Sequence, residues 1–200
     1  MIFIEIVYQN KILFSFEIKI TDLICNHINK KNMNDSNSNF QLDELFFEAD
    51  ALIAQGKIAE AISTLESILV EDASYGKAYN HMGWIYETKF KDYKKAEEFY
   101  KKCYAYSPDY PAIYINLSIM LSTLGKYDEL EIFIKKGLEV TGTDKAALTN
   151  ELGIMYELKG DYKNAIEQFR NAVKLSLNDA NVDTYSKSIQ RCKKKMEIFE

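Results

Sequence analysis

A ten-residue motif recurs four times along this sequence at a nearly constant spacing. The four copies are GKIAEAISTL at 56–65, KDYKKAEEFY at 91–100, GKYDELEIFI at 125–134 and GDYKNAIEQF at 160–169. Equivalent positions of the copies are Ala61, Ala96, Leu130 and Ala165, which are 35, 34 and 35 residues apart. A period of this length is typical of stacked helix-turn-helix repeats. The chain is therefore expected to fold as an array of helix pairs.

Residues upstream and downstream of the motif repeat with the same period and explain how the helices could pack. Small residues recur at Ala49, Gly83, Ser118 and Gly153, and large residues recur at Leu65, Tyr100, Ile134 and Phe169. Two helices approach to roughly 8–10 Å only where side chains at the crossing are small and large neighbours fill the groove. These two columns therefore predict closely packed antiparallel helices.

The turn between the two helices of a pair has its own signature. Glycine stands at 56, 125 and 160, and it ends a helix readily because it adopts the left-handed conformation that other residues resist. The second copy differs, because Lys91 takes the place of the glycine and one residue is inserted in the turn before it.

These features resemble the tetratricopeptide repeat family. The fourth copy has the residues of the family's defining columns at Leu152, Gly153, Tyr156, Gly160, Tyr162, Ala165, Phe169 and Ala172, and the second copy matches almost as well. The repeats are expected at 42–75, 76–110, 111–145 and 146–179. The resemblance implies an all-α fold, a right-handed α-solenoid of four helix-turn-helix units.

Residues 180–200 are expected to form a helix that caps this array. Its apolar residues follow a helical spacing, at Val182, Tyr185, Ile189, Cys192, Met196 and Phe199. The terminal unit of a repeat array needs a polar outer face, and a basic run supplies one: Lys187, Arg191, Lys193, Lys194 and Lys195. We interpret these cations as a solvated face; the alternative is contact with acidic partners or nucleic acid.

The N-terminal 32 residues differ from the repeats. Apolar residues alternate along Ile12, Phe14, Phe16, Ile18 and Ile20, which is the period of a β-strand and predicts a small β-hairpin. Alternatively, Met33 is the true start and residues 1–32 are a non-native, upstream extension. Charges within the apolar run argue against a signal peptide and a membrane span. Residues 33–41 are expected to be a polar linker.

Composition and motifs narrow the function. The net charge of −5 argues against a nucleic-acid partner, since phosphate binding needs a cationic surface. Three separated cysteines, Cys25, Cys103 and Cys192, predict neither a disulfide framework nor a metal site, and favour a reducing, cytoplasmic location. No phosphate-binding loop or catalytic signature is present in the sequence. We therefore expect a non-enzymatic protein with no cofactor and no membrane partner.

In the tetratricopeptide family, a concave groove lined by the first helix of each pair binds peptides. The resemblance assigns this role to Phe46, Asp50, Lys77, Asn80, His81, Trp84, Glu87, Ile115, Asn116, Ile119, Asn150, Ile154 and Glu157. Trp84, the only tryptophan, is either a binding anchor or a residue that packs against the preceding repeat. The family's cationic clamp for chaperone C-termini is disfavoured, because no cation occupies its columns. The mixed apolar and acidic lining instead predicts an amphipathic or partly basic partner segment.

The sequence thus predicts an adaptor or assembly factor that binds a peptide of a partner protein, as a monomer or weak homodimer. Two alternatives remain open: a secretion-type chaperone that holds an effector segment, and a structural subunit of a larger complex whose groove stays empty.

Overall fold

The computed structural model describes residues 40–199 of the chain. The β-hairpin or upstream extension predicted for residues 1–32, and most of the linker predicted for 33–41, lie outside the described residues. Residues 40 and 41, which were assigned to the linker, are helical. Within residues 40–199 the structure contains helices and connecting turns but no strand, which confirms the all-helical prediction for this part of the chain.

The chain divides into two compact units, Met1–Phe47 and Glu48–Glu200. In the first unit, residues 40–47 are helical, and the rings of Phe46 and Phe47 meet edge to face with their centroids 6.1 Å apart. The second unit contains the rest of the repeat region, and the paragraphs below concern it alone.

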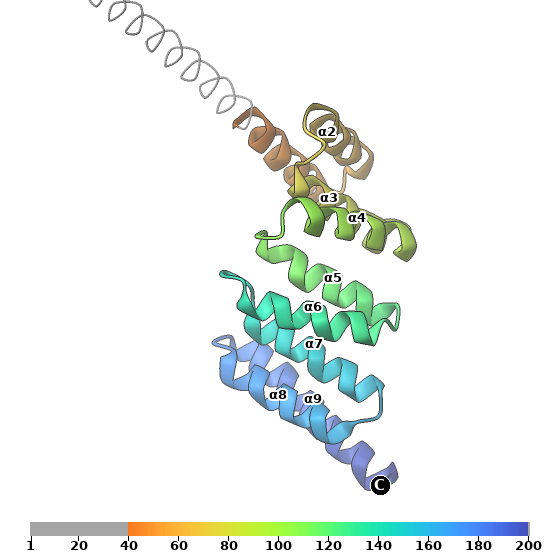
Figure 1. The fold of residues 1–200 in the computed structure, drawn as a ribbon, viewed down its shortest axis with the longest axis vertical. Helices are drawn as coiled ribbons and strands as arrows, with labels where there is room; N and C mark the ends of the chain where they lie inside the picture. The colour runs from red at the N-terminus through yellow and green to blue at the C-terminus, as the bar shows by residue number, and fades with distance from the viewer. Residues whose placement is uncertain (1–39, 200) are drawn as a thin grey trace, which may run out of the picture. The chain divides into compact units, whose positions relative to one another are not determined.

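Consecutive helices of the second unit pack as antiparallel neighbours (Figure 1). Residues 48–54 are helical, and they are followed by α2 (Ile58–Glu71), α3 (Gly76–Ile85), the π-helical turn η1 (Tyr86–Phe90), α4 (Tyr93–Tyr106), α5 (Pro111–Thr123), α6 (Tyr127–Glu139), α7 (Lys145–Leu158), α8 (Tyr162–Leu175) and α9 (Asp179–Phe199). The pairs α3–α4, α5–α6 and α7–α8 correspond to the second, third and fourth sequence copies.

Aspartate side chains fix where several of these helices begin. Asp92, Asp144 and Asp161 precede α4, α7 and α8, and each carboxylate accepts a hydrogen bond from the backbone amide three residues later. Such N-caps satisfy amides that have no partner within the helix, and each stabilises a helix by about 1 kcal/mol. Two of the three sit in the DY pair of the repeated motif.

The turns between paired helices explain both the glycine column and its exception. Gly56, Gly125 and Gly160 have positive φ angles of 77°, 69° and 79°, and Lys91 takes the same left-handed conformation at 57°. The residue inserted before Lys91 is accommodated by η1, where the Lys91 amide donates to the carbonyl of Tyr86, five residues earlier. A π-helical turn holds one more residue than an α-helical turn, so α4 still begins in register with the other second helices.

The small and large columns meet inside the pairs α3–α4 and α7–α8, as the sequence predicts. A Cβ atom on Gly83 would lie 2.5 Å from Cδ1 of Tyr100, and one on Gly153 would lie 2.6 Å from Cδ1 of Phe169. Both rings are fully buried. The glycines therefore provide the space in which the aromatic rings of the second helices pack.

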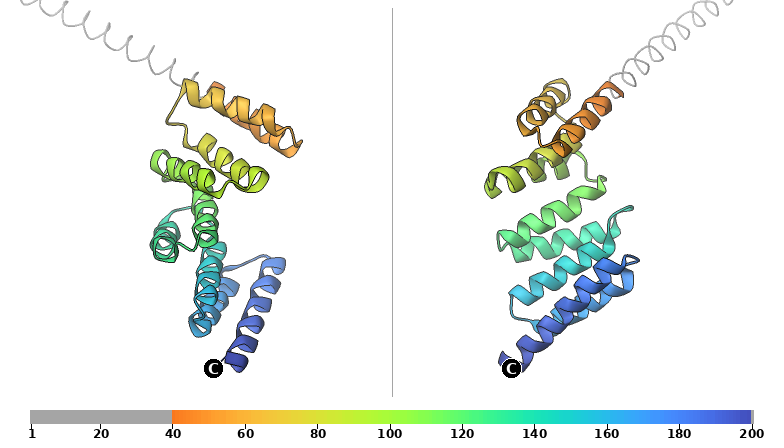
Figure 2. Two further views of the ribbon diagram at one scale, coloured as in Figure 1. Left: turned by 90° about the vertical axis from the view of Figure 1, so that its right-hand side faces the viewer. Right: turned by 180° about the vertical axis from the view of Figure 1, so that it is seen from behind.

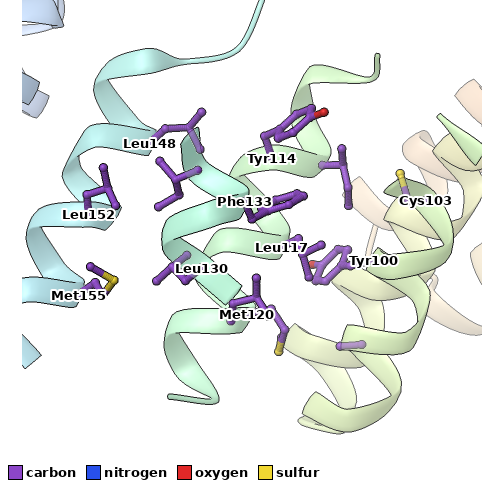
Figure 3. Packing of buried hydrophobic residues seen from close by; sticks show 14 of the residues in the cluster. Tyr100, Cys103, Tyr114, Leu117, Met120, Leu130, Phe133, Leu148, Leu152 and Met155 are labelled. Atoms are coloured by element: carbon purple, nitrogen blue, oxygen red, sulfur yellow. The ribbon is translucent and has the colours of Figure 1, made fainter. Parts of the chain in front are cut away.

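The central core is shared by the second, third and fourth repeats. Tyr114 stacks on Phe133 with ring centroids 5.1 Å apart, and Leu117 and Leu148 pack in the same cluster (Figure 3). Gly137 leaves room for this arrangement, since a Cβ atom there would lie 2.7 Å from Cδ1 of Tyr114. Hydrophobic contact between successive repeats therefore holds the array together.

Candidate functional site

A hollow of about 220 Å³ lies where the first helices of three successive repeats face one another. It is lined by Asp50, Ile53, Asn80, His81, Trp84 and Asn116. Five of these residues belong to the groove set predicted from sequence, and Ile53 does not. Ile53 occupies the same repeat column as Glu87 and Glu157, so the column pattern contained the signal that would have identified it.

Two asparagines connect neighbouring repeats at the hollow. The Nδ2 atom of Asn116, on α5, donates a hydrogen bond of 2.9 Å to Oδ1 of Asn80, on α3. Asn80 is only 4% exposed, so its amide is held in place. A buried polar group is costly unless it is hydrogen-bonded, and this pair therefore fixes how α3 and α5 meet beside the hollow.

An acidic side chain stands at the mouth of the hollow. Oδ1 of Asp50 lies 3.2 Å from Nε2 of His81, and the side chains are 66% and 16% exposed, respectively. The imidazole thus positions a carboxylate that is largely open to water. Asp50 is the only lining residue that carries a permanent charge.

Trp84 lines the hollow and is partly exposed. The Nζ atom of Lys89, which belongs to η1, lies 5.2 Å from the centroid of the indole ring. This distance is within the range of a cation–π contact. The side chain therefore lines the hollow and also contacts an ammonium group.

The remaining predicted residues of α3 and α5 have other surroundings. Glu87 accepts a 2.6 Å hydrogen bond from the hydroxyl of Tyr100, and burial together with this carboxylate raises the pKa of Tyr100. Lys77 lies with its Nζ atom 5.8 Å from the ring of Tyr75. Ile115 packs against the central core, and Ile119 is 38% exposed but does not line the hollow. Phe46 belongs to the first unit and is buried.

The face of α7 that carries the other predicted residues is involved in contacts with α9. Glu157 is 8% exposed and accepts hydrogen bonds from Arg191 Nε at 2.7 Å, Arg191 Nη2 at 2.6 Å and Lys195 Nζ at 2.8 Å. Burial would raise the pKa of Glu157, but the hydrogen bonds and charges of these two cations lower it to about 2. Ile154 packs in a cluster with Phe169 and Cys192, and Asn150 is partly exposed.

Helix α9 packs along α8 (Figure 2). Tyr185 and Cys192 of its predicted apolar stripe are buried, whereas Phe199 is 73% exposed. The basic run is exposed at Arg191 and half-exposed at Lys195, but these two side chains also bind Glu157 of α7, so the interpretation as a solvated face is incomplete for them. They do so because residues four apart project from the same side of a helix and can reach one carboxylate together.

Within residues 40–199, no three His, Cys, Asp or Glu side chains gather closely enough to hold a metal ion. No helix in this range is both long enough and apolar enough to cross a bilayer.

Comparison with known proteins identifies the repeats. The family model described as "Tetratricopeptide repeat" matches residues 76–110 and 148–179, which correspond to the second and fourth sequence copies. These two segments are tetratricopeptide repeats, as the sequence predicted. The search of curated protein sequences found no match.

Solved structures of tetratricopeptide proteins have the same fold. PilF of Pseudomonas aeruginosa aligns with a TM-score of 0.71 and 17% identity, over 80% of this chain and 71% of its own. BtubC of P. vanneervenii aligns with a TM-score of 0.66 and 18% identity, over 78% and 73%. YrrB, described as a TPR protein with an unusual peptide-binding site, aligns with a TM-score of 0.60 and 18% identity, over 76% of each chain. The chain thus has the fold of a tetratricopeptide repeat protein.

Proposed function

We propose that this protein is a non-catalytic adaptor or assembly factor that binds a peptide segment of a partner protein, and that the hollow beside Trp84 is part of the binding site. Tetratricopeptide repeats are generally interaction scaffolds. The observation that carries the proposal is the convergence of an exposed carboxylate, a fixed amide pair and the only tryptophan on one hollow formed by three successive repeats.

The size of the hollow favours a peptide side chain over a free small molecule. Its volume of about 220 Å³ is below the roughly 300–1,000 Å³ typical of small-molecule sites. Further first-helix residues of the predicted groove set, such as Ile119, are exposed. An extended or helical segment that inserts one side chain and runs along the neighbouring repeats fits this arrangement.

The lining also bears on the two interpretations of Trp84. A tryptophan that only packed against the preceding repeat would have no surface in a hollow, whereas Trp84 lines one. Tryptophan is enriched among residues that dominate binding energy at interfaces, because it offers a large rigid surface with a polar N–H. We therefore favour its role as a binding anchor.

The proposal can be tested by selecting peptides from a random displayed library on the full-length protein. Affinities of the selected peptides, labelled with a dye, are then measured by fluorescence anisotropy for the wild type, Trp84→Ala and Asn116→Ala. Tyr106→Ala is the matched control, since it removes a half-exposed aromatic ring on the second helix of the same repeat. We expect the two hollow variants to bind at least about tenfold more weakly and the control to bind as the wild type does. Equal binding by all four proteins would refute the proposal.

A further inference from the structure

Only one of the residues that line the hollow has a permanent charge, and that charge is negative. The carboxylate of Asp50 is 66% exposed, while His81 occupies Oδ1 at 3.2 Å. The amides of Asn80 and Asn116 are neutral and already bonded to each other. A positively charged side chain of the partner would therefore meet an exposed carboxylate, beside which the amides of Asn80 and Asn116 are neutral.

The indole ring of Trp84, which also lines the hollow, already contacts a cation. Lys89 places its ammonium 5.2 Å from the ring centroid of Trp84, from an exposed position in the π-helical turn η1. An exposed cation–π contact of this kind is weak, since water screens the charge. A partner cation that gained both the indole and the carboxylate could therefore displace the ammonium at little cost.

We infer that the hollow recognises an arginine of the partner peptide, whose guanidinium lies against Trp84 and pairs with Asp50 in place of Lys89. This inference rests on the proposed function and specifies what the same site selects. Arginine fits better than lysine because its planar guanidinium stacks on an aromatic ring while its N–H groups bind a carboxylate. The lysine ammonium is more strongly hydrated and cannot stack in this way.

The test is a double-mutant cycle on the peptides obtained by selection. Arginine in a selected peptide is replaced by citrulline, which has nearly the same shape but no charge, and both peptides are measured against the wild type and Asp50→Asn. We expect citrulline to weaken binding to the wild type by about tenfold and to Asp50→Asn by less than about twofold.

Lys89 provides a second, independent measurement. If its ammonium competes with the partner's guanidinium, Lys89→Ala should bind the arginine peptide about two- to threefold more tightly than the wild type. Lys94→Ala is the matched control, since it removes the same charge from an exposed position on α4. Within residues 40–199, Lys89 contacts the indole ring of Trp84 and Lys94 does not. The control should change affinity less than Lys89→Ala does, and equal effects would mean that only the overall charge matters.

The outcomes separate this inference from the proposed function. Suppose that the peptides require Trp84 and Asn116, but that the change from arginine to citrulline does not weaken binding to the wild type. The inference would then be overturned and the peptide-binding function would stand. The same conclusion would follow if this change weakened binding to Asp50→Asn as much as it weakens binding to the wild type. Peptides that bind independently of Trp84 and Asn116 would overturn both. A lysine peptide that binds as tightly as the arginine peptide would show that the hollow selects charge but not the guanidinium, and would also overturn the inference.

Discussion

Helices α3 and α7 are first helices of two repeats and carry their predicted groove residues in the same columns, yet their surroundings differ. On α3 these positions hold Asn80 and Trp84, which line an open hollow. On α7 they hold Asn150 and Ile154, and the next position in the pattern, Glu157, is buried under the cations of α9. Equivalent positions in a repeat array thus line an open hollow in one place and contact a docked helix in another.

The helix that follows each repeat makes the difference. Helix α3 is followed by the first helix of another repeat, α5, which contributes the neutral amide of Asn116. Helix α7 is followed in the array by α9, which contributes two cations four residues apart. The position of a residue in the repeat therefore indicates which face of the helix carries it. The residues of the neighbouring helix determine whether its side chain borders a hollow or is held in an ion pair.

The largest effect is expected from breaking the contact of Glu157 with α9. Glu157→Gln should lower the free energy of unfolding by about 2 kcal/mol at pH 7, because hydrogen bonds from two cations to a nearly buried carboxylate are weakened. The matched change in η1, Glu87→Gln, should cost less than about 1 kcal/mol, since the amide oxygen can still accept a hydrogen bond from the hydroxyl of Tyr100. Urea unfolding of both variants measures the comparison, and equal losses would contradict it.

The same contact should depend on pH. The pKa of Glu157 is about 2 in the folded protein, and an unperturbed glutamate has a pKa of about 4.3. Its contribution to stability is therefore present above about pH 5 and is lost as the pH falls toward 2. The difference in stability between the wild type and Glu157→Gln should shrink over this range, and a constant difference would show that charge is not its origin.

A smaller loss is expected when Ile154 is truncated. Ile154→Ala should lower the free energy of unfolding by about 1.5 kcal/mol, because the partly exposed side chain packs against the cluster around Phe169. Affinity for the selected peptides should not change. Trp84→Ala, in the same column of α3, should show the opposite pattern, with a greater effect on peptide affinity than on stability. Unfolding and anisotropy measurements on both variants test this, and a loss of peptide affinity in Ile154→Ala would extend the binding site to α7.

Replacement of Glu151 by glutamine should stabilise the protein. Glu151 occupies the same repeat position as His81 and Asn116, which line the hollow. On α7, however, the side chain at this position is only 9% exposed, and burial raises the pKa of the Glu151 carboxyl group to about 7. The folded state therefore holds a proton that the unfolded chain releases near pH 4.3, so the wild type loses stability as the pH rises from about 4.5 to 7. Glu151→Gln should be more stable than the wild type by about 1 kcal/mol at pH 8, with a smaller difference at pH 5. Unfolding at the two pH values measures this, and a destabilised variant at pH 8 would mean that the carboxylate has a partner.

The smallest effects are expected at the turns that end the first helices. Lys91→Gly should stabilise the protein by about 0.5 kcal/mol, because glycine adopts the left-handed conformation without the strain that a side chain brings. Gly160→Ala should cost about 1 kcal/mol for the same reason, since no atom lies near the added methyl group. Thermal unfolding of the two variants provides the comparison. If Lys91→Gly were instead less stable than the wild type, the contacts of the lysine side chain would stabilise the protein by more than the strained backbone at this residue destabilises it.

Much of the fold could be predicted from the sequence because its determinants are local and repeated. The 34- and 35-residue period, the turn glycines and the pairing of Gly83 with Tyr100 follow from short-range geometry, and five of the six residues that line the hollow were predicted from the sequence. The docking of Arg191 and Lys195 on Glu157 could not be predicted in this way. It depends on how far flexible side chains reach between residues that are 34 and 38 apart in sequence, and no column of a repeat records that.

The π-helical turn η1 has a practical consequence for engineering this scaffold. It absorbs an extra residue within a single turn, and α4 still packs on α3 and α5 as a second helix does. The loop that precedes α4 is thus a natural point for grafting: residues could be added, removed or exchanged there to redesign what stands beside Trp84. The remaining repeats would keep their phase, so new selectivity could be built without redesigning the stack.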